Sequence, residues 1–145
     1  MRISRIDQYA NIAKIISMRG SCERLQVGCV ILKDNRIIAT GYNGPLKGEK
    51  ECSEVCDVSK PCQRAVHAEQ NAICFAAHQG ISLEGSTLIT THSPCAHCAA
   101  LIIQAGINKV YFIEEFRSTE GLELLEKHQI PCTHLKVFVN LIKKI

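Results

Sequence analysis

The chain has 145 residues, which is near the commonest size of a single domain. It is 46% hydrophobic and 21% charged, enough apolar material for a buried core, which excludes an intrinsically disordered chain. No apolar run is long enough for a transmembrane helix, and residues 1–7 lack the continuous apolar stretch of a secretory signal. A formal net charge of +3 and an aromatic content of 5% do not favour a dedicated nucleic-acid-binding protein.

Elements in the first half of the chain follow from local patterns. Ser4 and Asp7 form the pattern of a capping box, and apolar residues at helical spacing predict a helix that ends near Gly20. The β-branched runs 27–33 and 36–42, separated by Asp34-Asn35, predict a hairpin. Residues from about 43 to 62 combine glycine, proline, charges and cysteines, and we expect an irregular insertion that a core alone does not order.

Helices and strands alternate in the rest of the chain. We expect helices over 64–78, 95–105 and about 118–128, the first two closed by Gly80 and Gly106, and strands over 87–91, 109–113 and 133–139. This order predicts an α/β fold in which a five-stranded mixed sheet carries helices on both faces. With no linker or repeat, we expect a single domain over residues 1–145, with the cysteine-rich insertion inside it.

Nine cysteines are unusual for a chain of this length. Their odd number, without a secretory signal, predicts a reducing cytoplasmic compartment, where clustered thiols bind metals or take part in catalysis. Two motifs fit this role, His67-Ala68-Glu69 and Pro94-Cys95-Ala96-His97-Cys98, and each stands at the start of a predicted helix.

The two motifs together predict a catalytic zinc site. His67, Cys95 and Cys98 supply three ligands and leave the fourth tetrahedral position for water. Two thiolates offset the charge of zinc, so the water needs a nearby base, and Glu69 lies two residues from the histidine. Zinc nucleobase deaminases have this motif pair, with the glutamate as acid and base.

Simpler interpretations of the same residues remain open. His67 can be a helix-capping imidazole, Glu69 a solvated carboxylate, and the two motif cysteines small buried hydrophobes. His92 and His97 lie beside the second motif, but a fourth protein ligand would close the position that catalysis needs. We therefore expect both histidines outside the metal shell.

Four segments together resemble the deoxycytidylate (dCMP) deaminase family. They are SCERLQVG at 21–28, GYNG at 41–44, CQRAVHAEQNAI at 62–73 and SPCAHCA at 93–99, and the similarity extends from about residue 4 to 139. The cysteine-rich insertion is similar to that of the bacterial and phage branch. The resemblance implies a three-layer α/β/α sandwich of the cytidine deaminase type and hydrolytic deamination of dCMP to dUMP and ammonia. It also implies dCTP as a second candidate substrate, and a host-cytoplasm location if the chain is viral.

The resemblance also implies roles for individual residues. His67, Cys95 and Cys98 would bind the catalytic zinc, and Glu69 would move protons between water, the ring nitrogen and the leaving ammonia. The backbone of Ala68 is expected near the cytosine carbonyl and Asn43 near the sugar hydroxyl. Ser21 and Arg24 fall in the segment that holds the 5′-phosphate in the family, although both also fit a solvated loop.

Regulation and assembly follow only from the resemblance. Regulated members respond to dCTP and dTTP, which implies a regulatory nucleotide site near residues 41–48, with Gly44 and Lys47, and magnesium accompanying the triphosphate. A homo-oligomer, a hexamer by analogy, is expected, with a small-molecule deoxynucleotide as substrate and neither membrane nor nucleic acid as partner.

A second, structural zinc is expected at the insertion. Setting aside Cys29, Cys74 and Cys132 as core residues leaves four cysteines outside the catalytic pair, Cys22, Cys52, Cys56 and Cys62. They bracket a segment too polar to order itself, and a tetrathiolate site would clip it to the rest of the chain. The alternative is a set of unpaired surface thiols.

Two other functions remain possible from the sequence. A polynucleotide deaminase acting on tRNA or single-stranded DNA would share the metal core, but the chain lacks strong basicity and aromatic residues. A non-catalytic zinc module would need a fourth protein ligand and would have no use for Glu69.

Overall fold

The computed structural model describes residues 2–136, and its centre is a five-stranded sheet in the order β2-β1-β3-β4-β5. The strands are β1 (Gly28–Lys33), β2 (Arg36–Tyr42), β3 (Thr87–His92), β4 (Lys109–Glu114) and β5 (Cys132–His134). Strand β1 is antiparallel to both β2 and β3, whereas β3, β4 and β5 run parallel. The predicted mixed sheet is confirmed.

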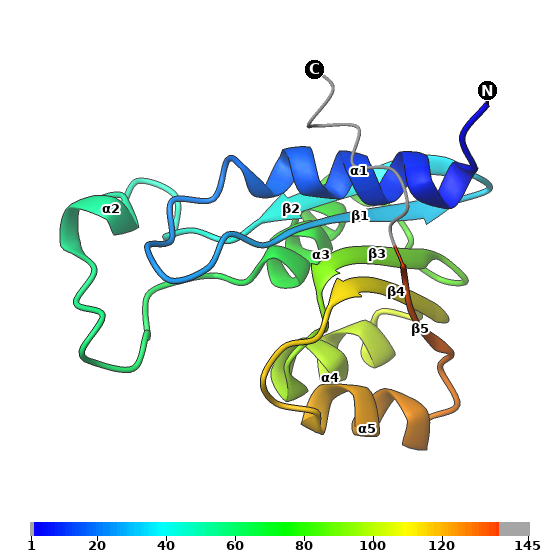
Figure 1. Cartoon of the computed structure of the whole chain (residues 1–145). Coiled ribbons are helices and arrows are strands. Elements are labelled where there is room, and N and C mark those ends of the chain that lie inside the picture. Colours follow the sequence, from blue (N-terminus) through cyan, green and yellow to red (C-terminus); the bar gives the residue numbers. More distant parts are fainter. Residues whose placement is uncertain (1, 137–145) are drawn as a thin grey trace.

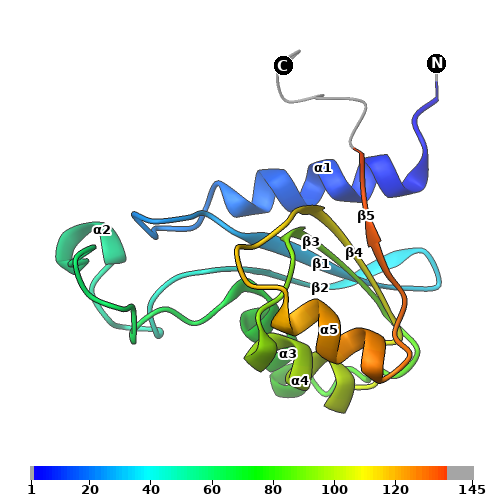
Figure 2. The same ribbon diagram turned by 60° about the horizontal axis from the view of Figure 1, so that its bottom comes forward.

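Helices cover both faces of this sheet (Figures 1 and 2). They are α1 (Arg5–Ser17), α2 (Cys52–Val55), α3 (Ala68–Gln79), α4 (Ala96–Gln104) and α5 (Glu120–Lys127). Helix α1 packs on one face, against Val30 and Leu32 of β1 among others, and α3, α4 and α5 pack on the other, where Cys29 and Ile31 point. Because side chains alternate along a strand, β1 is buried on both sides. The α/β/α arrangement is therefore confirmed.

Local signals near the N-terminus also hold. The Ser4 hydroxyl accepts a hydrogen bond from the Asp7 N–H at 3.0 Å and donates to the Asp7 carboxylate, which starts α1. Asp34 and Asn35 both have positive φ, at 51° and 60°, as a two-residue hairpin turn requires.

The insertion projects away from the sheet (Figure 1) and contains the short helix α2, which the sequence did not predict. The following helix starts at Ala68 instead of the predicted Arg64. The reason is a backbone bridge: Val66 N–H donates to the Gly44 carbonyl at 2.7 Å, and Gly44 N–H donates back at 3.1 Å. This pairing keeps the chain extended up to His67, the N-cap of α3.

The last strand, predicted over 133–139, is shorter than predicted within the described residues. It runs from Cys132 to His134, and residues 137–139 of the prediction lie outside the described part of the chain. No helix in residues 2–136 combines the length and apolar character needed to cross a bilayer.

Candidate active site

The two helix-start motifs meet at the carboxyl end of β3. His67 Nδ1 lies 3.5 Å from Cys95 Sγ and 3.3 Å from Cys98 Sγ. Tetrahedral zinc with bonds of about 2.1 Å to nitrogen and 2.3 Å to sulfur separates such ligand atoms by roughly 3.6 Å. In residues 2–136 this is the one group of three or more metal-ligating side chains whose donor atoms all lie within 4.8 Å. The three residues therefore fit a zinc ion with one open position.

Local structure holds the ligands in place. Cys95 is the N-cap of α4, and its sulfur accepts a hydrogen bond from the Cys98 N–H at 3.5 Å. His67 caps α3, where its own N–H donates to the Gln70 side chain at 2.8 Å. Both helices thus direct their positive N-terminal ends at the ligand atoms, which favours thiolates there.

The electrostatics of the ligands are strongly coupled. Hydrogen bonding with Cys98, together with that from His67, lowers the pKa of Cys95 to about 3. The same hydrogen bond, followed by burial, raises the pKa of Cys98. Hydrogen bonding to Cys95 raises the pKa of His67. Zinc needs both thiolates and a neutral imidazole, so these shared protons must leave when the metal binds.

Glu69 is buried beside this group, with 4% of its surface exposed. Desolvation by burial raises the pKa of its carboxyl group, because a low dielectric penalises the charged form. Its Oε1 lies 3.4 Å from the Thr90 hydroxyl. A solvated surface carboxylate is therefore excluded for Glu69, and a buried carboxyl of raised pKa suits a group that both takes up and releases a proton.

Close backbone packing fixes the start of α3. A Cβ at Gly41 of β2 would lie 2.1 Å from the Ala68 carbonyl oxygen, so only glycine fits there without displacing the helix. The buried Cys29 thiol donates to the same carbonyl at 3.3 Å. These contacts set the position of Glu69 relative to the sheet.

A cavity of about 380 Å³ opens over the ligand group. This volume is in the range of small-molecule sites. Its wall contains the predicted residues His67, Glu69, Cys95, Ala68, Asn43, Arg24, Cys22 and Cys62. His92 also lines it, whereas His97 is exposed on α4.

Asn43 lines this cavity, and its side-chain amide bonds to the loop before β1. Its Oδ1 accepts from the Val27 N–H at 2.8 Å, and its Nδ2 donates to the Leu25 carbonyl at 2.7 Å. The amide therefore shapes the loop before β1, and one hydrogen on Nδ2 and one lone pair on Oδ1 remain for a ligand.

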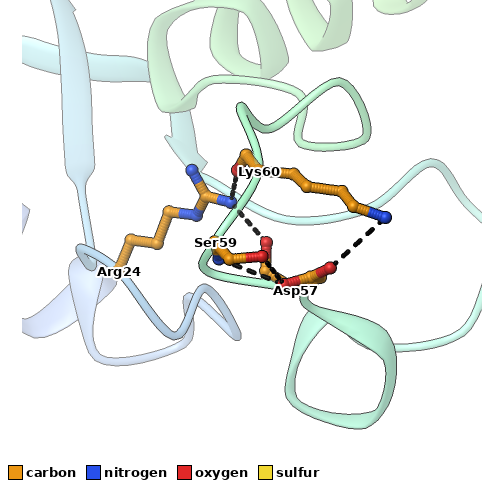
Figure 3. Close-up of polar contacts among 4 residues, drawn as sticks. All are labelled: Arg24, Asp57, Ser59 and Lys60. Atoms are coloured by element: carbon orange, nitrogen blue, oxygen red, sulfur yellow. Dashed lines mark hydrogen bonds and ion pairs between the residues drawn. The ribbon is translucent and has the colours of Figure 1, made fainter.

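Arg24 connects this loop to the insertion (Figure 3). Its Nη2 donates to the Asp57 carbonyl oxygen at 2.9 Å and also to the Lys60 carbonyl oxygen. Ser59 in turn donates to the Asp57 carboxylate from its hydroxyl at 2.6 Å and from its N–H at 3.1 Å, which lowers the pKa of Asp57. Sequence reasoning did not anticipate this connection.

A second cavity, of about 420 Å³, lies beyond the end of β2. It is lined by Gly44 and Lys47, the two residues expected near a regulatory nucleotide, and by Arg19. Ser21 lines this cavity and is absent from the wall of the first, and its hydroxyl is buried without a hydrogen-bond partner.

The four cysteines of the expected structural zinc are not brought together in ligating geometry. No three of Cys22, Cys52, Cys56 and Cys62 have sulfur atoms mutually within 4.8 Å. Cys22 and Cys62 share the wall of the first cavity, and Cys52 is buried in α2. Of the cysteines set aside as core, Cys29 is buried and Cys132 partly so, but Cys74 is exposed because it falls on the outer face of α3.

Sequence reasoning missed two residues of the first cavity, Phe116 and Arg117. Both follow β4, and Ser93 holds them: its hydroxyl accepts from the Phe116 N–H at 2.7 Å, and its N–H donates to the Glu114 carbonyl at 2.9 Å. A pair of residues just after a predicted parallel strand was the available signal, since ligands bind at such strand ends.

Comparisons with known proteins agree with this geometry. Residues 4–114 match the cytidine and deoxycytidylate deaminase zinc-binding region. The ComE operon protein 2 of Bacillus subtilis is 39% identical over 81% of this chain, which spans only 63% of that protein. The deoxycytidylate deaminase of Mycobacterium phage D29 is 37% identical over 75% of this chain and 94% of its own length. A crystal structure of the dCMP deaminase from cyanophage S-TIM5, in complex with dCMP and dUMP, is 34% identical with a TM-score of 0.86, covering 93% of this chain and 99% of that one. The chain belongs to the cytidine and deoxycytidylate deaminase family.

Proposed function

We propose that the protein hydrolyses dCMP to dUMP and ammonia. One observation carries this proposal: a buried carboxyl, Glu69, adjoins a His-Cys-Cys group with an open position, at the base of a cavity of about 380 Å³. The names of the phage D29 and cyanophage relatives supply the substrate.

The chain's own residues account for binding and proton transfer. His67, Cys95 and Cys98 would hold a zinc ion, which would supply the activation of the attacking water. Glu69 would take a proton from the attacking water and deliver protons to the ring nitrogen and to the departing amine. Ala68 places main-chain atoms beside the base, and Asn43 offers its remaining amide hydrogen to the sugar.

The phosphate of the substrate would lie in the first cavity beside Arg24, which forms part of the wall. Arg24 lines the cavity of the metal-ligating group, which supports its predicted contact with the phosphate. Ser21 lines the second cavity instead. dCTP is the second candidate substrate of the same site.

A regulatory nucleoside triphosphate, with magnesium, would bind in the second cavity. Lys47 and Arg19 supply cationic groups there, beside the carboxylates of Glu49 and Glu51, and the unpartnered Ser21 hydroxyl and the backbone of Gly44 supply polar groups. The test is binding of dCTP and dTTP to the wild type and to Lys47→Ala, with and without magnesium. Equal affinity of both proteins would contradict this placement.

A homo-oligomer, a hexamer by family analogy, is supported by the outer faces of α3 and α4, which pack side by side. None of their exposed residues is Lys, Arg, Asp or Glu; these residues are Cys74, Phe75, Ala77, His78 and Gln79 on α3 and His97, Ala100, Leu101 and Gln104 on α4. Helix α5 instead exposes Glu120, Glu123, Glu126 and Lys127. The exposed surface formed by these two helices therefore carries no charged side chain, although 21% of the residues in the chain are charged. Such a depletion of charge is typical of a subunit interface.

We retain the prediction of a single deaminase domain with a zinc-binding insertion at about 43–62. The polarity of that segment, its cysteines Cys52, Cys56 and Cys62, and Cys22 before the hairpin support a structural zinc that draws the sulfur atoms together on binding. The need for reduced thiolates at the catalytic group supports a cytoplasmic location.

The deciding experiment is ammonia release from dCMP, dCTP, deoxycytidine and a cytosine-containing oligonucleotide, measured side by side with zinc-loaded protein. We expect the highest kcat/KM on dCMP. Activity confined to the oligonucleotide would favour a polynucleotide deaminase, and no activity on any substrate with zinc fully bound would favour a non-catalytic module.

A further inference from the structure

His92 stands at the carboxyl end of β3 and lines the first cavity, but the proposed reaction gives it no role. It lies close to the catalytic carboxyl group, because the Thr90 hydroxyl contacts both the His92 carbonyl oxygen, at 3.0 Å, and Glu69 Oε1, at 3.4 Å. What the imidazole can do at this place depends on which of its two ring nitrogens carries a proton.

The hydrogen bonds of Thr91 assign the tautomer of this ring. Thr91 Oγ1 accepts a hydrogen bond from the Gly28 N–H at 3.1 Å and lies 2.9 Å from His92 Nδ1. Thr91 is buried, and Nδ1 is the one acceptor within residues 2–136 that its hydroxyl hydrogen reaches. A buried hydroxyl that donated to nothing would cost free energy, so the Thr91 hydroxyl donates to Nδ1. Nδ1 is therefore unprotonated, and the proton of the neutral ring is on Nε2.

The Nε2–H group of His92 is consequently a donor that the protein itself does not use. It forms no hydrogen bond within the described residues, and neither ion pair found there involves His92, although Glu114 is its register partner on β4. Partial burial lowers the pKa of His92, and the Glu114 carboxylate opposes this shift only in part, so the ring is neutral at neutral pH. An unpaired donor in the wall of a cavity can bind an oxygen atom of a ligand.

A neutral donor suits a neutral oxygen better than it suits a phosphate. Charged donors form the stronger bonds to phosphate, and the same wall contains two arginines. The Thr90 hydroxyl, which contacts both Glu69 and the His92 main chain, places His92 near the group that acts on the base. Both observations favour the nucleoside part of the substrate as the partner of the ring.

We propose that His92 is a substrate-binding residue whose Nε2–H donates to a neutral oxygen of the nucleoside, and that Thr91 fixes the ring for this contact. This inference rests on the proposed function, in which a nucleotide enters the first cavity. It assigns a role to a histidine that lies outside the metal-ligating group.

The test compares the wild type with His92→Leu, His92→Gln and, as a matched control, His128→Leu, which changes an exposed histidine at the end of α5 outside both cavities. Leucine removes the donor, whereas the amide nitrogen of glutamine can take the place of Nε2. Calorimetry gives the dissociation constants of the zinc-loaded proteins for dUMP and for deoxyuridine. We expect His92→Leu to weaken both about 3- to 10-fold, as the loss of one hydrogen bond predicts. His92→Gln and His128→Leu should stay within about 2-fold of the wild type.

Heteronuclear NMR of the wild-type ring tests the tautomer without any turnover. We expect a protonated Nε2 and an unprotonated Nδ1 in the free protein, and a shift of the Nε2–H resonance when dUMP is added. A protonated Nδ1 would overturn the inference, as would unchanged affinity in His92→Leu. Equal losses in His92→Leu and His92→Gln would show that the ring only packs, and a loss confined to dUMP would put the ring at the phosphate; either result also overturns it. A wild type that binds both ligands with the expected dependence on His92, but does not deaminate dCMP, would refute the proposed function and leave the role of His92 supported.

Discussion

Replacing Glu69 by glutamine tests the chemistry of the site most directly. Glutamine has nearly the same shape as glutamate and can keep the contact with the Thr90 hydroxyl, 3.4 Å away, but it cannot take up a proton. His67, Cys95 and Cys98 are unchanged, so zinc should stay bound. The substitution therefore removes proton transfer and leaves the metal group and the cavity in place.

The expected loss follows from the role of the carboxyl group. Removing a general acid-base group costs roughly 10²- to 10⁴-fold in rate, or about 2.7 to 5.5 kcal/mol in the activation free energy. Because Glu69 would serve several transfers in one cycle, we expect the upper part of this range or more. Stability should move in the other direction: because burial raises the pKa of Glu69, this group lowers the stability of the fold progressively as the pH rises from its ordinary pKa through its raised pKa. Glutamine removes that cost, and the thermal midpoint at neutral pH should be equal to or above that of the wild type.

Three measurements decide this prediction: turnover of dCMP, zinc per chain by atomic absorption, and the thermal midpoint. We expect activity to fall by at least 100-fold, about the lower bound for loss of such a group, with zinc content unchanged and no loss of stability. Activity within a few-fold of the wild type would refute the assignment of Glu69 as proton carrier. A lost zinc ion would show instead that Glu69 supports the metal, and the activity loss would then say nothing about proton transfer.

Three further predictions concern the fold, the insertion and the assembly. Gly41→Ala places a Cβ 2.1 Å from the Ala68 carbonyl oxygen, so the free energy of unfolding in urea should fall by about 1–3 kcal/mol, and activity should fall with it. Unchanged values would mean that α3 can shift away from β2 at no cost in stability or activity. Cys56→Ser should reduce about two zinc ions per chain to about one and lower the thermal midpoint, whereas the exposed Cys74→Ser should do neither; a single zinc in both wild type and Cys56→Ser would contradict the structural site. Phe75→Glu should shift the molar mass in light scattering toward the monomer while Ile37→Glu, also exposed but on the hairpin, should not; equal masses would remove the support for the α3–α4 interface.

The grouping of His67, Cys95 and Cys98 could be predicted from sequence because each of the two motifs stands at a helix start. His67 and Cys95 each cap a helix, and a helix start places residues at fixed short spacings on one side of the first turn. The spacing of Cys95 and Cys98 therefore already implies that both sulfur atoms face the same point. The order of helices and strands fixed the rest, since the ends of β3 and its neighbours bring successive helix starts to one edge of the sheet.

The contacts of Arg24 could not be predicted in this way. The position of Arg24 depends on main-chain carbonyls 33 and 36 residues further along the chain, in an insertion with almost no regular structure. Such contacts leave no periodic pattern, because the acceptors are backbone atoms that every residue possesses. The predicted start of α3 at residue 64 is too early for a related reason. The pairing of Val66 with Gly44 is long-range and overrides the local helix propensity of residues 64–67.

Backbone contacts, more than side-chain identity, determine how accurately the site is built. The Ala68 carbonyl is fixed by Gly41 and by the Cys29 thiol, and a Cβ at Gly121 of α5 would lie 1.9 Å from the Pro94 carbonyl at the second motif. In each motif a glycine therefore packs against the carbonyl oxygen of the residue next to a metal-ligating side chain. A side chain in place of either glycine would push that carbonyl, and the ligating residue beside it, out of position. A displacement of about 1 Å is enough to cost a large factor in rate. It follows that substitutions at these glycines should reduce catalysis through ligand geometry even where all three ligands and Glu69 are intact.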